Sequence, residues 1–154
     1  NPRELGADLL SNAVAAYQRY RGACIVVDFG TATTFSAVSA AGDFEGVAIA
    51  VGLGVAAEAL SSATSQLPRV SLSAPARAIG KNTVQSMQSG LVLGHIGLVE
   101  GVVRRMKSEL GGEARVIATG GYSRALAPLS PEIDTLEPWL TLDGLRILHQ
   151  LNPA

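Results

Sequence analysis

The residues best suited to chemistry follow an apolar run early in the chain. Asp28 lies near the end of the run Cys-Ile-Val-Val-Asp-Phe, and Gly30 and Thr31 follow it directly. A carboxylate beside glycine and hydroxyl groups offers a hard-oxygen environment that suits a cation and phosphate oxygens. The segment therefore predicts an anionic ligand that binds together with a cation. The alternative, which the residues alone leave open, is that Asp28 forms a turn by accepting hydrogen bonds from backbone amides.

Two further segments place polar side chains at the starts of expected helices. Asp8, in the segment NPRELGAD, could orient a hydroxyl group and accept its proton. From the residues alone, the preferred interpretation is that Asp8 stabilises the first turn of a helix through the helix dipole. Asn82 or Thr83, in the segment IGKNT, could cap a helix and still contact a ligand.

These segments resemble motifs of the type III pantothenate kinases, a family of the actin-like ATPase superfamily. DFGTATT resembles the family's cation- and ATP-binding hairpin, while NPRELGAD and GKNT resemble its pantothenate-binding motifs. The motifs keep the family's order and approximate spacing from Asn1 to about Asn152, which is nearly the whole chain. The resemblance implies an α/β fold, namely a ribonuclease H-like (actin-like ATPase) domain with a mixed sheet flanked by helices.

The resemblance assigns the nucleotide and the cation to the ends of two strands. It implies that Asp28 binds a monovalent cation, K⁺ or NH₄⁺, and that Thr31 contacts ATP. Gly120 and Gly121, in the later segment ATGG, resemble the strand end at which adenosine approaches the backbone in this superfamily. ATP and Mg²⁺ complete the set of expected cofactors.

The same resemblance assigns pantothenate to the first helix and to a second segment farther along the chain. It implies that Gly6, Ala7, Asp8 and Leu9 hold pantothenate, with Asp8 as the catalytic base. It also implies that Thr83 contacts the same substrate. The sequence departs from the family at one of these positions, because Leu9 stands where the family has an arginine. A leucine cannot make charge-assisted hydrogen bonds to a substrate.

The implied function is ATP-dependent phosphorylation of pantothenate to 4'-phosphopantothenate, the first step of coenzyme A biosynthesis, by a homodimer. Residues 1–154 would form the carboxyl-terminal domain of such a kinase, and the amino-terminal domain that cradles the ATP phosphates would be absent from the chain. One alternative is a noncatalytic binding or regulatory relative that keeps the scaffold, which Leu9 favours. Another is a kinase of the same superfamily that acts on a sugar or a short acid.

The composition indicates one globular domain without a nucleic-acid partner. Hydrophobic residues make up 47% of the 154 residues, and the formal net charge of -1 gives no broad positive field for a phosphate backbone. No apolar stretch is long enough to span a bilayer, so a cytoplasmic location is expected. Cys24 lies in an apolar run and is expected in the core. His95 and His149 lack neighbours at metal-ligand spacing, so we expect them in the core or at the surface.

Hydrophobic periodicity predicts an alternation of helices and strands. The expected helices cover residues 3–20, 55–66, 82–110, 123–129 and 141–151, and the expected strands cover residues 23–29, 33–39, 44–51 and 115–119. The first three strands are expected to be antiparallel. Glycine disfavours a regular helix, so the part of the chain that carries Gly90, Gly94, Gly97 and Gly101 is expected to form two tightly packed segments.

Overall fold

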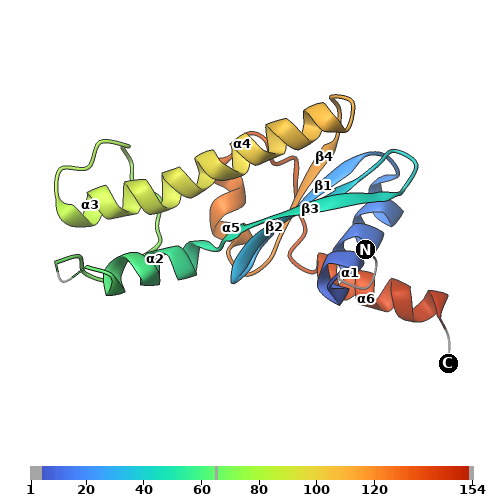
Figure 1. The fold of residues 1–154 in the computed structure, drawn as a ribbon, viewed down its shortest axis with the longest axis horizontal. Helices are drawn as coiled ribbons and strands as arrows, with labels where there is room; N and C mark the ends of the chain where they lie inside the picture. Colours follow the sequence, from blue (N-terminus) through green and yellow to red (C-terminus); the bar gives the residue numbers. More distant parts are fainter. Residues whose placement is uncertain (1–4, 65, 153–154) are drawn as a thin grey trace.

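The computed structural model describes residues 5–64 and 66–152, and its centre is a five-stranded mixed sheet in the order β3-β2-β1-β4-β5 (Figure 1). The strands are β1 (Cys24–Phe29), β2 (Ala32–Val38), β3 (Phe44–Val51), β4 (Arg115–Thr119) and β5 (Thr135–Leu136). β2 pairs antiparallel with both β1 and β3, whereas β4 pairs parallel with β1 and β5 parallel with β4. This order and these directions are those of a ribonuclease H-like domain, which confirms the expected fold class.

Helices cover both faces of the sheet. They are α1 (Ala7–Tyr20), α2 (Leu53–Ser62), α3 (Thr83–Gln88), α4 (Gly94–Glu109), α5 (Ser123–Leu126) and α6 (Leu140–Leu151), with a π-helical turn at Ser89–Leu93 and a 3-10 turn at Ala127–Leu129. β1 separates two apolar layers, since successive residues of a strand point to opposite faces. Ile25 and Val27 belong to the cluster that includes Val99 of α4, whereas Cys24 and Val26 belong to the cluster of α1 and α6. Cys24 therefore lies in the core, as predicted.

The first helix is shorter than the sequence predicts. α1 begins at Ala7, with Gly6 as an extended N-cap residue whose carbonyl accepts a hydrogen bond from Leu10 at 3.1 Å. The described residues before Ala7 are not helical, and residues 3 and 4 lie outside the described part of the chain. The Asp8 side chain folds back over the cap residue. Asp8 Oδ1 lies 2.5 Å from the position that a Cβ on Gly6 would occupy. Glycine is accepted at an N-cap position far better than apolar residues are, which explains the later start.

The prediction of two tightly packed segments within residues 82–110 is wrong. α3, the π-helical turn and α4 follow one another without a break. Buried apolar side chains such as Val99 pack this long helix against the sheet. A Cβ added at Gly90, Gly94 or Gly97 would meet nothing within 4 Å, so these glycines face open space rather than a packed neighbour.

The remaining elements follow the predictions closely. Each of the predicted strands is present within one residue of its expected ends, and the short helix after β4 is present as α5 and a 3-10 turn. α2 begins at Leu53 and ends at Ser62, which places it slightly earlier than residues 55–66. β5 was not predicted, because Thr135 and Leu136 are too few to show a period.

Candidate active site

Two parallel strands end side by side at one edge of the sheet. Asp28 of β1 pairs in register with Thr119 of β4. Gly120, which follows β4, has φ +91°, and a Cβ there would collide with Asp28 Oδ1 and lie 2.7 Å from the Phe29 amide nitrogen. The Tyr122 amide then donates to the Phe29 carbonyl at 3.1 Å. Only glycine fits at position 120, and the backbone there lies directly against the Asp28 carboxylate.

The Asp28 carboxylate carries a charge that is only partly compensated. Its Oδ2 atom accepts a hydrogen bond from Asn12 Nδ2 at 3.0 Å. Burial raises the pKa of Asp28, the hydrogen bond from Asn12 lowers it, and the nearby charge of Asp8 raises it. Among the described residues, no lysine or arginine forms an ion pair with Asp28. A cation beside this carboxylate would supply the missing compensation.

A second oxygen at the same place lacks a partner. Thr119 Oγ1 is buried and has no hydrogen-bond partner among the described residues. Residues that pair in register on neighbouring strands point to the same face, so this hydroxyl lies on the face of Asp28. A carboxylate and a neutral oxygen suit a hard cation such as K⁺. The described residues at this strand end therefore fit the cation that the sequence predicts.

The turn that carries Thr31 is fixed by the start of α2. The Gly30 amide donates to the Ala32 carbonyl at 3.1 Å, and the Gly52 amide donates to the Thr31 carbonyl at 3.0 Å. A Cβ on Gly52 would lie 2.5 Å from the Gly30 carbonyl oxygen, so the two segments touch through their backbones. The Thr31 side chain is exposed. Thr31 and Asp28 thus lie near the same end of β1, where the sequence predicts the nucleotide.

The predicted substrate residues of α1 behave differently from one another. Ala7 and Asp8 are exposed, and Asp8 is close enough to Asp28 for its charge to raise the pKa of that carboxyl. Leu9 is 9% exposed and packs into the interior. Its side chain is therefore not presented to a ligand at the surface. The structure brings Gly6, Asp8 and Asp28 to one region, and the site has no cation at position 9.

Thr83 lies elsewhere. It is the first residue of α3 and is exposed, whereas Asn82 is the cap, since Asn82 Oδ1 accepts from the Gln85 amide at 2.9 Å. Gln85 Oε1 in turn accepts from the amide of Lys81, the residue before the cap, at 3.0 Å. Figure 1 shows α3 at the opposite end of the molecule from α1 and α6. Within this one chain, Thr83 is therefore not brought together with Asp8.

Sequence reasoning missed polar residues that support Asp28. Asn12 is 1% exposed, and its Oδ1 accepts from Thr141 Oγ1 at 2.7 Å. Asn12 stands on the apolar face of α1, next to Ala13, and a buried asparagine on such a face was the signal available. Thr141 gave no signal of its own, because its partner is distant in sequence.

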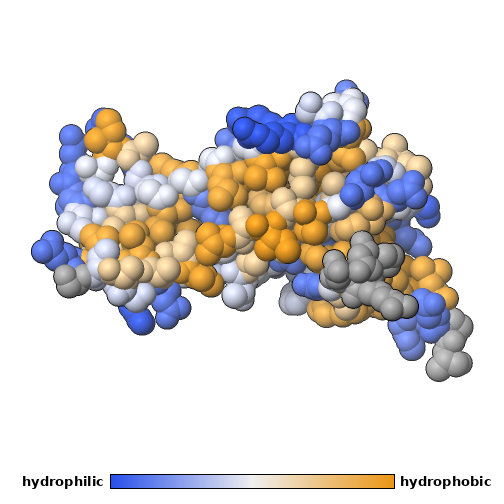
Figure 2. Space-filling view, viewed as in Figure 1, coloured by the Kyte–Doolittle hydropathy of each residue, from blue (hydrophilic) through white to orange (hydrophobic). Residues whose placement is uncertain are grey.

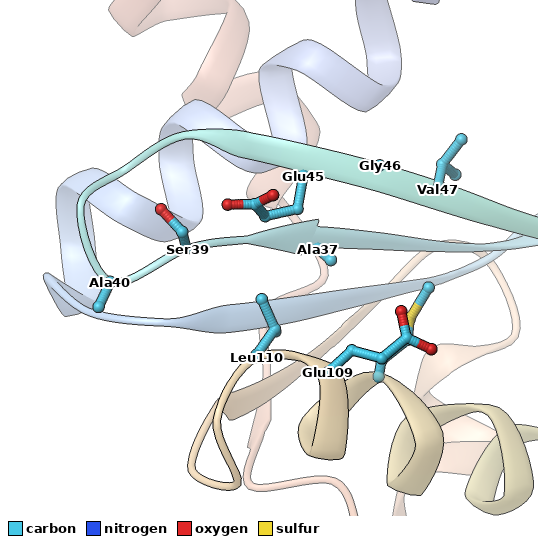
Figure 3. Close-up of a pocket in the computed structure, with 9 residues that line it drawn as sticks. Ala37, Ser39, Ala40, Glu45, Gly46, Val47, Glu109 and Leu110 are labelled. Carbon is cyan, nitrogen blue, oxygen red and sulfur yellow. The ribbon is translucent and has the colours of Figure 1, made fainter.

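A groove of about 490 Å³ lies away from these residues, between β2, β3 and the end of α4. Figure 3 shows the Glu45 carboxylate on the strand side and Glu109 on the helix side, with Leu110 and Val47 among the apolar walls. Two carboxylates repel anions, so the groove does not suit a nucleotide or pantothenate.

In the described residues, no helix is long and apolar enough to cross a membrane.

Comparisons with known structures support the fold. A crystal structure from Campylobacter jejuni, described as a conserved Baf family transcriptional activator, matches with a TM-score of 0.70 at 20% identity, over 98% of this chain and 66% of that one. An Alp12 filament structure matches with a TM-score of 0.58 at 12% identity, over 94% of this chain and 52% of that one. At these identities the likeness concerns the fold alone.

Sequence comparisons are more specific. The family model described as type III pantothenate kinase matches residues 1–105. The type III pantothenate kinase of Moorella thermoacetica is 53% identical over 152 residues, which is 99% of this chain and 60% of that protein. The type III pantothenate kinase of Geobacter sp. strain M21 is 51% identical over 99% of this chain and 60% of that protein. The chain thus spans about 60% of the length of these curated relatives, and it belongs to the type III pantothenate kinase family.

Proposed function

We propose that the protein containing this chain phosphorylates pantothenate with ATP to give 4'-phosphopantothenate. The observation that carries this proposal is the convergence of Asp8, Asp28 and the Gly120 backbone at one edge of the sheet. The curated relatives quoted above are named as kinases, so the comparisons do not favour the noncatalytic alternative. The proposal concerns the whole protein, because the chain spans only about 60% of those relatives.

Asp8 is the catalytic base of the proposed reaction. Its carboxylate accepts the proton of the pantothenate hydroxyl while the hydroxyl oxygen attacks the γ-phosphorus of ATP, and ADP leaves. Asp8 is exposed on the first turn of α1 and so is open to a substrate. Gly6 and Ala7 offer backbone beside this carboxylate. Leu9 supports α1 by its burial and supplies no charge to the substrate.

The nucleotide lies over the ends of β1 and β4 in this proposal. Gly120 and Gly121 let adenosine approach the backbone, and Thr31 contacts ATP from the neighbouring turn. Asp28 and Thr119 would hold a monovalent cation, K⁺ or NH₄⁺, which supplies positive charge against the phosphates. Mg²⁺ accompanies ATP, as phosphoryl transfer requires charge neutralisation.

Residues 1–154 form the carboxyl-terminal domain of the kinase in this proposal, and the rest of the protein supplies the cradle for the ATP phosphates. The coverage of about 60% of the relatives supports this division. The chain alone would then bind at most part of the nucleotide. Turnover is expected only when the remaining part is present.

A homodimer explains the position of Thr83. Asp8 and Thr83 are separated within one chain, so a shared pantothenate site would take Asp8 from one copy and Thr83 from another. The molecule also exposes apolar side chains on the edge strand β3, where Ile49 is 67% exposed and Val51 is 50% exposed. Figure 2 shows apolar surface in the middle of this face, where β3 crosses the molecule. Exposed apolar strips of this kind are common at protein interfaces.

The proposed activity is tested with the protein in its full natural length. Purified protein is assayed for ATP-dependent phosphorylation of pantothenate in K⁺, NH₄⁺ or Na⁺, beside the variant Asp8→Asn and the control Asp43→Asn on an exposed turn. We expect turnover in K⁺ or NH₄⁺, a loss of at least about 100-fold in Asp8→Asn, and wild-type rates in Asp43→Asn. Absence of turnover in the full-length wild type would overturn the proposal in favour of the noncatalytic relative.

Sharing of the site between copies has its own test. Asp8→Asn and Thr83→Ala are each expected to be inactive as homodimers. When both are unfolded and refolded together in equal amounts, half of the dimers are mixed, and one of their two sites is intact. We expect about a quarter of wild-type activity on statistical grounds. If the mixture stays inactive while the wild type recovers after the same treatment, the shared site is wrong.

A further inference from the structure

The Asp28 carboxylate is the end of a chain of hydrogen bonds that crosses three elements. Thr141 Oγ1 of α6 donates to Asn12 Oδ1 of α1 at 2.7 Å, and Asn12 Nδ2 donates to Asp28 Oδ2 of β1 at 3.0 Å. A carboxylate can only accept, so the amide must turn its NH₂ group toward Asp28. The amide oxygen is then left for Thr141. The direction of every bond in the chain is thereby fixed.

The close crossing of α1 and α6 brings Thr141 within reach. Gly144 lies one turn after Thr141, and a Cβ on Gly144 would collide with the backbone carbonyl of Ser11. Glycine at this position lets the two helix backbones touch, next to Asn12. The crossing is thus built at the place where the hydrogen-bond chain passes from one helix to the other.

The chain of hydrogen bonds gives the two carboxylate oxygens of Asp28 different surroundings. Oδ2 is held by Asn12, whereas Oδ1 lies against Gly120 and 3.7 Å from the position of a Cβ on Gly30. Oδ1 therefore points along the glycine-lined strand ends, toward the proposed nucleotide and cation. We infer that Asn12 and Thr141 are positioning residues, which hold the Asp28 carboxylate with Oδ1 directed at the ligands of the active site. This inference rests on the proposed function.

A purely structural role would also bury and pair Asn12, so the test must separate the two roles. Thr141→Val removes the donor with little change of shape, and Thr141→Ser keeps the hydroxyl. Asp143→Asn is the matched control, since it weakens another contact between α1 and α6, the ion pair of Arg19 with Asp143 at 3.0 Å. That ion pair does not touch Asp28. The variants are made in the full-length protein.

Three measurements are compared across these variants: the KM and kcat for ATP, the increase in melting temperature on replacing Na⁺ with K⁺, and the Asp28 rotamer in a crystal structure. For Thr141→Val we expect the KM for ATP to rise about 10-fold, a smaller K⁺-induced increase in melting temperature, and a turned or disordered Asp28 carboxylate. Thr141→Ser restores all three. Asp143→Asn lowers the melting temperature and leaves the KM unchanged.

The inference is overturned if Thr141→Val lowers only the melting temperature, like the control, and keeps the wild-type KM and the wild-type Asp28 rotamer. Failure of the proposed function looks different, because the wild type itself would then lack turnover. In that case the crystal structures decide alone, and an unchanged Asp28 rotamer in Thr141→Val overturns the positioning role. Asn12→Leu, which breaks the chain at its middle, repeats the test at a second position.

Discussion

Thr33 Oγ1 lies 3.0 Å from His95 Nε2, and both side chains are buried. This hydrogen bond joins β2 to α4 across the apolar layer, beside the Phe29 ring, whose centroid is 6.3 Å from that of His95. His95 is therefore a core histidine with a polar partner, whereas His149 lies exposed on α6. The bond satisfies two polar groups that would otherwise be costly to bury.

Removal of either partner should destabilise the protein. We expect His95→Leu and Thr33→Val each to lower the free energy of unfolding by about 1–3 kcal/mol, because each leaves a buried polar atom without its partner. The double variant should cost less than the sum of the two. Urea unfolding of the wild type, the two single variants and the double variant gives the coupling free energy between Thr33 and His95. Additive costs would show that the hydrogen bond contributes nothing to stability.

The stability of the protein should depend on pH through His95. Burial lowers the pKa of His95 below 6.5 in the folded state. A group whose folded pKa is depressed gives stability that is fully present above the unfolded pKa and is lost as the pH falls through the folded pKa. Wild type should therefore lose stability below about pH 6.5 more steeply than His95→Gln does. Urea unfolding gives the free energy of unfolding of both proteins from pH 8 to 5. The same dependence on pH in both proteins would contradict this prediction.

The two glycines after β4 should respond differently to alanine. Gly120→Ala should lower the free energy of unfolding by roughly 2 kcal/mol or more, because of its positive φ and its contact with Asp28. Gly121→Ala is the matched control, since a Cβ there meets nothing within 4 Å. It should keep the stability and raise the KM for ATP, if adenosine approaches at this point. Thermal unfolding and kinetics of both variants separate these effects, and equal stability would refute the packing argument.

Local patterns explain which parts of the fold the sequence could predict. β1 was predictable because Ile25, Val26 and Val27 form a short continuous apolar run, and the carboxylate after them marked the edge of the sheet. The chemistry of Asp28 and Asp8 followed from residue type and from the resemblance to a known family. Their proximity required the structure, since α1 reaches β1 only through packing.

The remaining features depend on contacts that no local pattern encodes. Asn12 and Thr141 are 129 positions apart, so neither predicts the other. Gly144 looks like a weak point in a helix, yet it allows α1 and α6 to touch. The glycines of α4 led to the opposite error, because they were expected in tightly packed segments and Gly94 and Gly97 face open space. Glycine in a helix is compatible with both a packed face and an open one. Only the tertiary contacts decide between them.

The charge of Asp28, which is only partly compensated, should lower the stability of the folded protein. The pKa of Asp28 is raised, first by burial. A carboxyl with a raised folded pKa gives stability that is present below its unfolded pKa and is lost as the pH rises through the folded pKa. Asp28→Asn should therefore raise the melting temperature at neutral pH while it removes activity, because the amide oxygen can still accept from Asn12. The gain should shrink as the pH falls toward 3.8, the ordinary value for aspartate, since wild-type Asp28 then becomes neutral. Calorimetry of both proteins from pH 7 to 4, in Na⁺ without K⁺ or NH₄⁺ so that neither of these cations compensates the charge, checks this. A variant that is less stable than wild type at pH 7 would show that Asp28 already has its compensating charge within the protein.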